Sequence, residues 1–284
     1  NKTLFSKSVA RTLLAKIYAE KPLRDYTKVI QYCDEVKADG FDLVDDFSDL
    51  FGMNAAGTDA KMRNTKESIL EAQFTSGAGN WCTWMFGRDL VNWNNNFTWA
   101  KWVTPSRDLI SAFKQEGDEV RFKESIVYYD CNWSNYYPSD NYPFMYKCRS
   151  ANSSIIKYRY ADVLLLKAEA LIMQDTPDLE GAADIIDKVR DRAKLGALPT
   201  SVRSNKNAML NALLKERRLE LAFEGQRWFD LVRLDKVEEV MNAVYAKDSG
   251  RKAQIYTFDK NSYRLPIPQS VIDANDKIHQ NPGY

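Results

Sequence analysis

Apolar residues recur with the period of an α-helix along much of this chain. In residues 1–40 two apolar stripes have positions three and four apart; Pro22 ends the first stripe and Gly40 closes the second. Residues 158–173 are apolar nearly all round and predict a helix buried among other helices. Residues 182–195 predict its amphipathic partner, capped by Gly196. The pattern therefore predicts two helical hairpins, one at the start of the chain and one past its middle.

Each predicted hairpin resembles a tetratricopeptide-type unit, in which a tight connection joins two amphipathic helices. Such a unit cannot bury both of its faces alone and needs neighbours to stack on. Between the hairpins, residues 67–74 and 121–129 predict short strands. Residues 104–113 predict a helix with Thr104 as its N-cap and Pro105 at its first position.

A further helix is predicted to carry three carboxylates on one stripe, because Glu216, Glu220 and Glu224 are spaced four apart. Apolar residues flank the stripe, so the carboxylates should be at least partly buried and should need arginine partners. The stretch itself supplies Arg217, Arg218 and Arg227. Gly225 is placed to end the helix in a left-handed turn. Two interpretations are acid–base catalysis and an internal ion network that fixes how helices dock; we favour the network, because catalysis also needs a cleft.

Charge and composition argue against several classes of function. Lysine and arginine number 40 and aspartate and glutamate 39, so the net charge of +1 gives no field that would attract a nucleic-acid backbone. His279 is the single histidine and the four cysteines form no C-x-x-C pair, which argues against a zinc site and histidine-dependent catalysis. No apolar run approaches the ~20 residues that span a bilayer. Cys131 and Cys148 allow a disulfide or two thiols, and we favour thiols because spacing alone does not bring the sulfurs together.

Four stretches in the second half of the chain resemble the SusD/RagB family, the outer-membrane nutrient-binding lipoproteins of Bacteroidetes. They are YRYADVLLLKAEA at 158–170, ERRLELAFEGQRWFDL at 216–231, PIP at 266–268 and QNPGY at 280–284. The motifs occur in the family's order, and residues 187–193 extend the match. The C-terminal half is therefore covered densely, whereas the N-terminal hairpin and the predicted strand at 67–74 fit more loosely.

The resemblance implies a mostly α fold, with a tetratricopeptide-like helical-repeat scaffold and a loop-rich, short-stranded region that binds ligand. We expect a single SusD-like domain over residues 1–284. It would consist of a helix hairpin and short strand (1–75), an aromatic loop-rich region (76–150) and a helical C-terminal scaffold with its tail (151–284). Family members are usually longer and begin with a lipoprotein cysteine, so we expect this chain to lack the anchor and the first helical repeat or more.

The resemblance also implies a function. Family members are not enzymes, so we expect no catalytic residues, no cofactor and no metal site. They capture oligosaccharides, or peptides in some branches, at the cell surface and deliver them to a SusC-like TonB-dependent transporter of the outer membrane. The expected partners are such a ligand and such a transporter, without nucleic acid. Membrane contact is expected only through an N-terminal lipid anchor that is absent from this sequence.

The physical argument for the site concerns residues 80–102, here called the tryptophan loop. Five tryptophans fall in 22 residues without helical or strand periodicity, among glycines and asparagines that mark irregular backbone. Sugar rings pack their C–H faces on indole and hydrogen-bond to amide and guanidinium groups; the related stacking of a nucleic-acid base contributes roughly 1–3 kcal/mol per ring. The predicted binding residues are Trp81, Trp84, Trp93, Trp99, Asn80, Arg88, Asn92, Asn94 and Asn96.

Several alternatives stay open. The tryptophans could instead anchor the loop on the helices, Trp102 is expected in the core, and Tyr136, Tyr137 and Tyr142 form a weaker second candidate. A glycoside hydrolase would need two carboxylates facing across a cleft, and Asp89 is the only carboxylate of the tryptophan loop. A helical-repeat scaffold that binds proteins would use a concave helix surface and would not need the loop.

Overall fold

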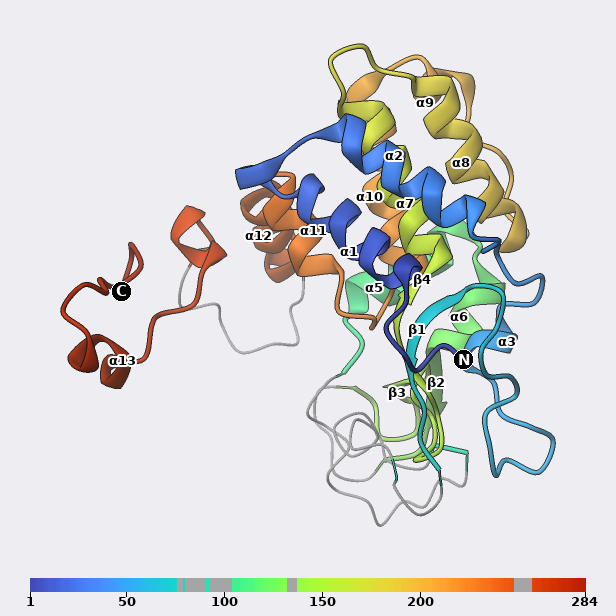
Figure 1. The fold of residues 1–284 in the computed structure, drawn as a ribbon. Helices are drawn as coiled ribbons and strands as arrows, with labels where there is room; N and C mark the ends of the chain where they lie inside the picture. Colours follow the sequence, from blue (N-terminus) through green and yellow to red (C-terminus); the bar gives the residue numbers. More distant parts are fainter. Residues whose placement is uncertain (76–78, 80–89, 92–103, 132–136, 248–256) are drawn as a thin grey trace. The chain divides into compact units, whose positions relative to one another are not determined.

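The computed structural model describes residues 1–75, 79, 90–91, 104–131, 137–247 and 257–284 (Figure 1). The chain divides into two compact units, Asn1–Gln226 and Arg227–Tyr284. Helices predominate in the first unit, together with short antiparallel strand pairs. Among the described helices, none is both long enough and apolar enough to cross a membrane.

The N-terminal hairpin forms as its apolar spacing predicts. It consists of helix α1 (Lys7–Ala19), the 3-10 turn η1 (Lys21–Leu23) and helix α2 (Tyr26–Ala38). Ser6 caps α1 and Asp25 caps α2, each accepting a hydrogen bond from a backbone N–H three residues further on. Gly40 takes the left-handed conformation (φ 91°) after α2 and so ends the hairpin where predicted.

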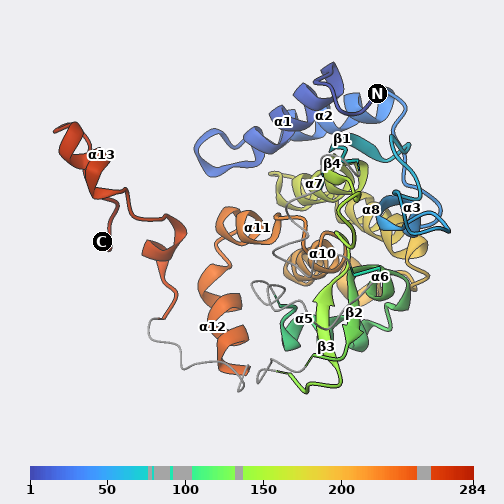
Figure 2. The ribbon, with the colours of Figure 1, turned by 90° about the horizontal axis from the view of Figure 1, so that it is seen from below.

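Helix α7 (Tyr160–Met173) is the centre of the helical core, as its apolar composition predicts. All of its residues except Lys167 and Met173 are buried. It lies between the α1–α2 pair and helix α10 (Lys206–Glu220), with helix α8 (Leu179–Arg192) packed along it (Figure 2). Full burial of a leucine or isoleucine side chain contributes about 1.5–3 kcal/mol, so this helix supplies much of the hydrophobic stability of the first unit.

The C-terminus of α8 differs from the prediction of a glycine cap at Gly196. Lys194 takes the left-handed conformation instead, with φ 61°. This conformation lets Lys194 N donate to Asp191 O and Leu195 N donate to Arg190 O, both at 2.9 Å, so carbonyl groups at the helix end are satisfied. The prediction was wrong because the turn forms two residues earlier than the nearest glycine. Helix α9 (Thr200–Arg203) then leads into α10.

Helix α10 ends at Glu220, four residues earlier than predicted. The Glu220 carbonyl oxygen accepts hydrogen bonds from Arg159 Nη2 at 2.7 Å and Lys147 Nζ at 2.9 Å, so it is not used to continue the helix. Phe223 (φ 65°) and Gly225 (φ 76°) then take the left-handed conformation. Gly225 is left-handed as predicted, but it lies five residues beyond the last residue of α10 and so does not end that helix.

Four strands of the described residues form two antiparallel pairs. Strand β1 (Ser68–Ala72) pairs with β4 (Ile155–Arg159), and β2 (Ile126–Tyr129) pairs with β3 (Tyr142–Met145). Strand β1 confirms the prediction for residues 67–74. The strand predicted for 121–129 is only half right, because helix α6 (Glu119–Ser125) precedes β2. Asp118 Oδ1 caps α6 by accepting from Arg121 N at 3.1 Å, a local signal that the apolar pattern did not reveal.

Helix α5 (Arg107–Glu116) begins later than predicted. Its N-cap is Ser106, whose Oγ accepts from Leu109 N at 3.1 Å. The predicted cap was wrong because the Thr104 hydroxyl has another partner, the hydroxyl of Tyr142 at 2.6 Å. The one-turn helix α3 (Ser48–Phe51) lies in the connection between α2 and β1.

In the second unit, the PIP segment (266–268) and the QNPGY tail (280–284) are joined by hydrogen bonds. The unit contains α11 (Arg227–Arg233), α12 (Val237–Lys247), η2 (Lys260–Tyr263) and α13 (Gln269–Ala274). The Gln280 side chain binds both backbone groups of Ile267, accepting from N at 2.8 Å and donating to O at 2.9 Å. Asn281 Nδ2 donates to Leu265 O at 2.7 Å. The QNPGY tail therefore holds the PIP segment in its extended form.

Candidate functional site

The residues predicted to bind ligand fall in segments 80–89 and 92–103, outside the described residues. They are Trp81, Trp84, Trp93, Trp99, Asn80, Arg88, Asn92, Asn94 and Asn96, and Trp102 lies in the same part of the chain. The structure does describe four neighbouring points: Gly79 before the tryptophan loop, Leu90 and Val91 within it, and Thr104 just after it. These four residues define the frame of the candidate site.

Leu90 is held by its side chain and by both of its backbone groups. The side chain is fully buried in a cluster with Tyr142 and Phe144 of β3. Its N–H donates to the Arg149 carbonyl oxygen at 2.8 Å, and its carbonyl oxygen accepts from the Tyr129 hydroxyl. Burial and paired backbone groups together fix the chain at this point.

The other frame residues contact the same part of the fold or the turn beside it. A Cβ on Gly79 would lie 3.2 Å from Cβ of Ala151, so the two backbones approach closely. Val91 packs on Gly57, where an added Cβ would lie only 2.9 Å from Val91 Cγ1. Thr104 Oγ1 lies 2.6 Å from the hydroxyl oxygen of Tyr142, the first residue of β3. Three of the four points are thus attached to β2, β3 or the segment that follows β3.

Arg149 stabilises the segment that follows β3. Its side chain is buried and donates from Nη2 to Glu124 Oε2 at 2.8 Å and to Glu124 O at 3.0 Å, while Nε donates to Tyr146 O at 2.9 Å. The guanidinium also lies 3.7 Å from the centre of the Tyr146 ring. We call β2, β3 and residues 146–151 the hairpin block, and Arg149 ties this block to α6.

The weaker aromatic candidate is wrong for Tyr142, and Tyr136 lies outside the described residues. Tyr142 is 2% exposed, and its ring centre lies 4.9 Å from that of Phe144. Tyr137 meets Tyr142 edge-on, and its hydroxyl donates to Pro105 O at 2.8 Å. These rings join the hairpin block to the start of α5 and form part of the core, because large aromatics with a satisfied hydroxyl bury well.

Cys131 and Cys148 of this region are both buried thiols, so the structure has the thiol pair that we favoured and not the disulfide. Burial in apolar surroundings makes such thiols structural.

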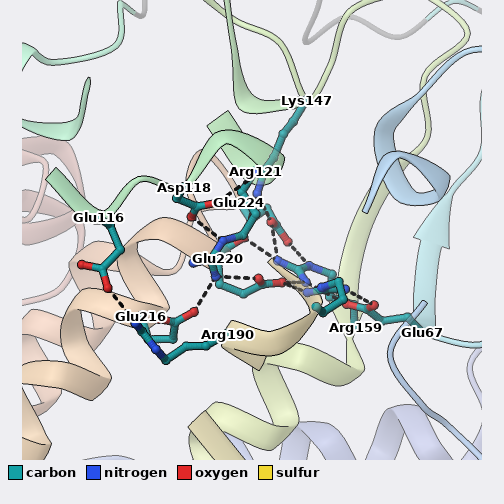
Figure 3. Close-up of polar contacts among 11 residues, drawn as sticks. Glu67, Glu116, Asp118, Arg121, Lys147, Arg159, Arg190, Glu216, Glu220 and Glu224 are labelled. Carbon is teal, nitrogen blue, oxygen red and sulfur yellow. Dashed lines mark hydrogen bonds and ion pairs between the residues drawn. The ribbon is translucent and has the colours of Figure 1, made fainter. Parts of the chain in front are cut away.

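The carboxylate stripe lies at the centre of a buried charge network (Figure 3). Glu220 accepts through Oε1 from Arg159 and Arg192, and through Oε2 from Arg121 Nη1 at 3.0 Å. The three arginines come from different elements: the end of β4, the end of α8, and α6. Glu220 therefore joins α10 to three segments that are distant in the sequence.

Two further carboxylates share the same cations. Glu67 accepts from Arg159 Nη1 and from Arg192 Nη1, each at 2.8 Å. Glu224 accepts from Arg159 Nε at 2.6 Å and Nη2 at 2.8 Å, and from Lys147 Nζ at 2.6 Å. Arg159 thus binds three carboxylates with its planar fork, an arrangement that lysine could not reproduce.

Glu216 extends the network toward the surface. It accepts from Arg121 Nη1 at 2.5 Å and from Arg190 Nη1 at 3.3 Å. Arg190 also donates to Glu116 Oε1 at 2.7 Å. Asp118 Oδ2 completes the surroundings of Arg121 by accepting from Nε at 2.6 Å. The stripe is therefore paired along its length, as an internal ion network requires.

The partners of the stripe differ from those predicted. Arg217 Nη2 donates to Asp162 Oδ1 at 2.8 Å, and Arg218 Nη2 donates to Asp108 Oδ2 at 2.6 Å, so neither binds the three glutamates. Arg227 is the first residue of the second unit. Local arginines were the wrong partners because residues next to a helical stripe point away from it.

Two phenylalanines lie against the cations of the network. The ring centre of Phe47 lies 4.9 Å from Arg192 Cζ and 5.3 Å from Lys147 Nζ, and that of Phe51 lies 4.7 Å from Lys147 Nζ. Arg159 Cζ is 5.9 Å from both rings. Aromatic faces attract cations, so these rings replace part of the lost hydration of the buried charges.

Burial and pairing oppose each other in setting the pKa values of the network. Burial alone raises the pKa of Glu220, but the charges of its three arginines outweigh burial and hold that pKa well below its ordinary value. For Glu216 burial wins, and the pKa is raised despite Arg121 and Arg190. Burial lowers the pKa of Lys147 to about 8, and Glu224 offsets only part of that effect.

The network is closed to ligands. Glu67, Glu216 and Glu220 are at most 1% exposed, as are Arg121 and Arg159. A substrate could not reach these carboxylates, so the network docks helices and strands against one another, as favoured from the sequence. Across the described residues, no group of three or more histidine, cysteine, aspartate or glutamate side chains is arranged to hold a metal ion.

Comparison with known proteins gives a consistent set of relatives. The model of the SusD family matches residues 137–284, just over half of the chain. SusD-like protein P2 of Formosa agariphila is 35% identical over 143 residues, which are 48% of this chain and 27% of that protein.

Two solved structures share the fold. A laminarin-binding SusD-like protein aligns with a TM-score of 0.70 and 24% identity, over 99% of this chain and 63% of that chain. Surface glycan-binding protein A from Bacteroides thetaiotaomicron in complex with laminarihexaose aligns with a TM-score of 0.73 and 18% identity, over 99% and 65%. The chain therefore spans less than two thirds of the length of these proteins. Its fold is the mostly α, tetratricopeptide-like architecture that the sequence predicts.

Proposed function

The chain belongs to the SusD family, and we propose that it is a nutrient-capture protein that binds glycans without transforming them. The observation that carries this proposal is the family match over residues 137–284. It covers the helical scaffold, including Glu216, Glu220, Glu224 and the tail that holds the PIP segment. Residues outside that scaffold would then determine which ligand is bound.

We propose the tryptophan loop as the binding site. Two or three of the indoles of Trp81, Trp84, Trp93 and Trp99 would stack on sugar rings, and Asn80, Arg88, Asn92, Asn94 and Asn96 would hydrogen-bond to the hydroxyls. The frame of the loop supports this assignment, because residues next to the segments are attached to a packed hairpin block. Sites held by rigid elements lose less conformational entropy on binding.

A glycan is favoured over a peptide as the ligand. Clustered indoles suit the flat C–H faces of sugar rings, and two similar proteins are described by their binding of laminarin or laminarihexaose. We further propose delivery of the bound oligosaccharide to a SusC-like TonB-dependent transporter, at the outer-membrane surface and with lipid anchoring of the whole protein. These points rest on family membership.

The proposal of a non-catalytic role rests on the placement of the carboxylates. Glycoside hydrolysis needs a pair separated by about 5 Å or roughly 6.5–9.5 Å across an accessible cleft. The tryptophan loop contributes only Asp89, and the glutamates of the network are buried behind arginines.

Affinity electrophoresis tests the function and the site together. The wild type is run through gels that contain laminarin, starch, or other plant and host polysaccharides, beside Trp81→Ala, Trp84→Ala, Trp93→Ala and Trp99→Ala. Trp228→Ala serves as a matched control, because Trp228 lies on α11 against Phe258. We expect a panel polysaccharide to retard the wild type and the control, and two or three of the loop variants to lose roughly tenfold or more in affinity.

Other outcomes would redirect the proposal. Retardation that survives all four loop substitutions would move the site elsewhere. Absence of retardation in every gel, with peptide binding by calorimetry, would favour the peptide-binding branch of the family. Release of reducing sugar would contradict the non-catalytic role.

A further inference from the structure

We propose that the hairpin block opens as a unit separate from the helical core, and that the charge of the Lys147 ammonium controls this opening. The block opens more readily while Lys147 is protonated and less readily once Lys147 is a neutral amine. All the residues involved belong to the scaffold, so the opening does not depend on which ligand the protein binds.

The hairpin block contributes to an apolar cluster of its own. Tyr142 and Phe144 of β3 are buried in a cluster with Leu90 and Cys131, and among the described residues no member of this cluster comes from α7, α8 or α10. Those three helices belong to a different, larger cluster. Groups of residues that pack mainly on one another tend to open cooperatively. The block can therefore open while the helical core stays closed.

Side chains near both ends of the block join it to the helices. Ile126, the first residue of β2, belongs to an apolar cluster with Leu219 of α10. Arg149 binds Glu124 of α6 at 2.8 Å. Lys147 differs from Ile126 because it brings a positive charge into the interior of the protein, where a charge is costly unless it is well paired.

The pairing of Lys147 is incomplete. Its side chain is 4% exposed, and Nζ donates to Glu220 O at 2.9 Å and to Glu224 Oε1 at 2.6 Å. Arg159 already binds Glu224 through Nε at 2.6 Å and Nη2 at 2.8 Å. Two cations therefore share one carboxylate, and the other acceptor of Lys147 is an uncharged carbonyl group.

Three charged groups from neighbouring elements face the ammonium: Glu224 from the turn after α10, Glu220 from the end of α10 and Arg159 from the end of β4. The rings of Phe47 and Phe51 also lie against it and carry no charge. Carboxylates and guanidinium groups ordinarily titrate far from pH 8. Burial lowers the pKa of Lys147 to about 8, and Glu224 offsets only part of that effect. Lys147 is therefore the group of this set that changes charge in mildly alkaline solution.

The direction of the effect follows from linkage. Opening of the block exposes Lys147 to water, where its pKa returns toward the ordinary 10.5. The open form therefore binds a proton more tightly than the closed form. The open fraction is largest below about pH 8, where Lys147 is protonated in both forms, and it falls as the pH rises toward 10.5.

Thiol labelling measures this opening in the intact protein. Cys148 belongs to the hairpin block and Cys33 to the helical core, and both are buried. Iodoacetamide is added at pH 7.5 and at pH 9.5, and the initial labelling rate of each thiol, found by mass spectrometry, is divided by that of a free cysteine at the same pH. We expect Cys148 to react roughly tenfold or more faster than Cys33 at pH 7.5, and its normalised rate to fall roughly tenfold by pH 9.5.

Lys147→Met removes the charge and leaves Glu224 bound to Arg159, so the normalised rate at Cys148 should be the same at both pH values. Glu224→Gln removes the shared carboxylate and should raise the rate at Cys148 at pH 7.5 by roughly threefold or more, with a smaller change at Cys33.

Lys61→Met is the matched control, because Lys61 also pairs with carboxylates, Asp46 at 2.9 Å and Asp49 at 2.7 Å, but is 37% exposed. It should keep the pH dependence of the wild type. Equal normalised rates at Cys148 and Cys33 in the wild type would overturn the separate opening of the block. A wild-type rate at Cys148 that does not change with pH, or a dependence that persists in Lys147→Met, would overturn its control by Lys147.

Discussion

At the scale of single residues, the charges of the first unit converge on Glu220. Its carboxylate receives three arginines that belong to other elements, whereas Glu216, one turn earlier, receives two. Two glutamates of one helical stripe therefore have opposite pKa shifts, lowered for Glu220 and raised for Glu216. The number of cations that pair with each carboxylate decides whether its pKa is lowered by pairing or raised by burial.

The first prediction compares these two residues. Glu220→Gln removes the charge that its arginines stabilise and leaves them buried without it, so we expect a loss of about 3–5 kcal/mol in the free energy of unfolding. Glu216→Gln removes a charge that burial already disfavours, so we expect a loss of about 1 kcal/mol. Urea unfolding at neutral pH measures both. Equal losses would contradict the assignment of Glu220 as the centre of the network.

The second prediction uses Lys147, whose folded-state pKa is lowered to about 8 from an ordinary value of 10.5. Between these two pH values the unfolded chain holds a proton that the folded chain has released. The free energy of unfolding due to this group therefore rises with pH across that window, and below pH 8 both states are protonated and the contribution is flat. In Lys147→Met this dependence is absent, while Glu224 keeps its paired bonds to Arg159.

The measurement is the difference in unfolding free energy between wild type and Lys147→Met at pH 7.5 and at pH 10. Other titrating groups cancel in that difference, which should shift in favour of the wild type by about 2 kcal/mol at the higher pH. A difference that is constant with pH would show that Lys147 is not held in the buried position.

At the scale of elements, the sequence predicted the helices that local periodicity marks, and it failed where tertiary contacts set the end of a helix. Helices α1, α2 and α7 follow from periodicity alone, because each buries one face or nearly its whole surface. The ends of α8 and α10 do not follow, because they are set by Lys194 in a left-handed turn and by side-chain cations on the Glu220 carbonyl. Helix boundaries depend on such contacts more than helix existence does.

The ion network was likewise only partly predictable from the sequence. The stripe was visible in the sequence, but Arg121 is 99 residues from Glu220 and Arg159 is 61 residues away. No spacing rule joins residues so far apart, although Arg159 and Arg192 do lie in motifs noted from the sequence. Leu90 was missed for a similar reason, since one leucine in an irregular aromatic stretch gives no periodic signal.

The third prediction concerns the two glycines that the sequence predicted as helix caps. Gly225 has φ 76° and Gly196 lies outside the left-handed region, and neither has atoms within 4 Å of an added Cβ. Gly225→Ala should therefore lower the free energy of unfolding by about 1–2 kcal/mol through backbone strain. Gly196→Ala should raise it by about 0.4–1 kcal/mol by restricting the unfolded chain. Thermal and urea unfolding of the pair measure this, and equal signs would contradict the assigned turn.

At the scale of the whole molecule, the contacts that stabilise the fold and the proposed binding site belong to different parts of the chain. The family match covers residues 137–284, which include α7, α8 and α10. The tryptophan loop lies before the matched region and is attached to the scaffold through the hairpin block. Its aromatic composition was recognisable without structure, whereas the way it is attached required the tertiary contacts of Leu90, Val91 and Thr104.

The last prediction follows from this separation. Glu220→Ala should lower the unfolding midpoint strongly, because it leaves buried arginines without their shared carboxylate. The fraction that stays folded should still bind laminarin, or the panel polysaccharide that retards the wild type, within about twofold of the wild-type affinity, because none of its ion-pair partners is a frame residue of the loop. Calorimetric titration is done at a temperature where circular dichroism shows a folded variant, with Glu220→Gln as the milder substitution.

Trp84→Ala and Trp93→Ala should behave in the opposite way, losing affinity with little change in the unfolding midpoint. Two contacts of the hairpin block could couple the two parts. Lys147 donates to the Glu220 carbonyl oxygen and to Glu224, and the Arg149 side chain binds Glu124 of α6 while its carbonyl oxygen holds Leu90. A folded Glu220→Ala protein that had lost only binding would show that a change in the network reaches the hairpin block through one of these contacts. In that case the scaffold would position the site in addition to supporting it.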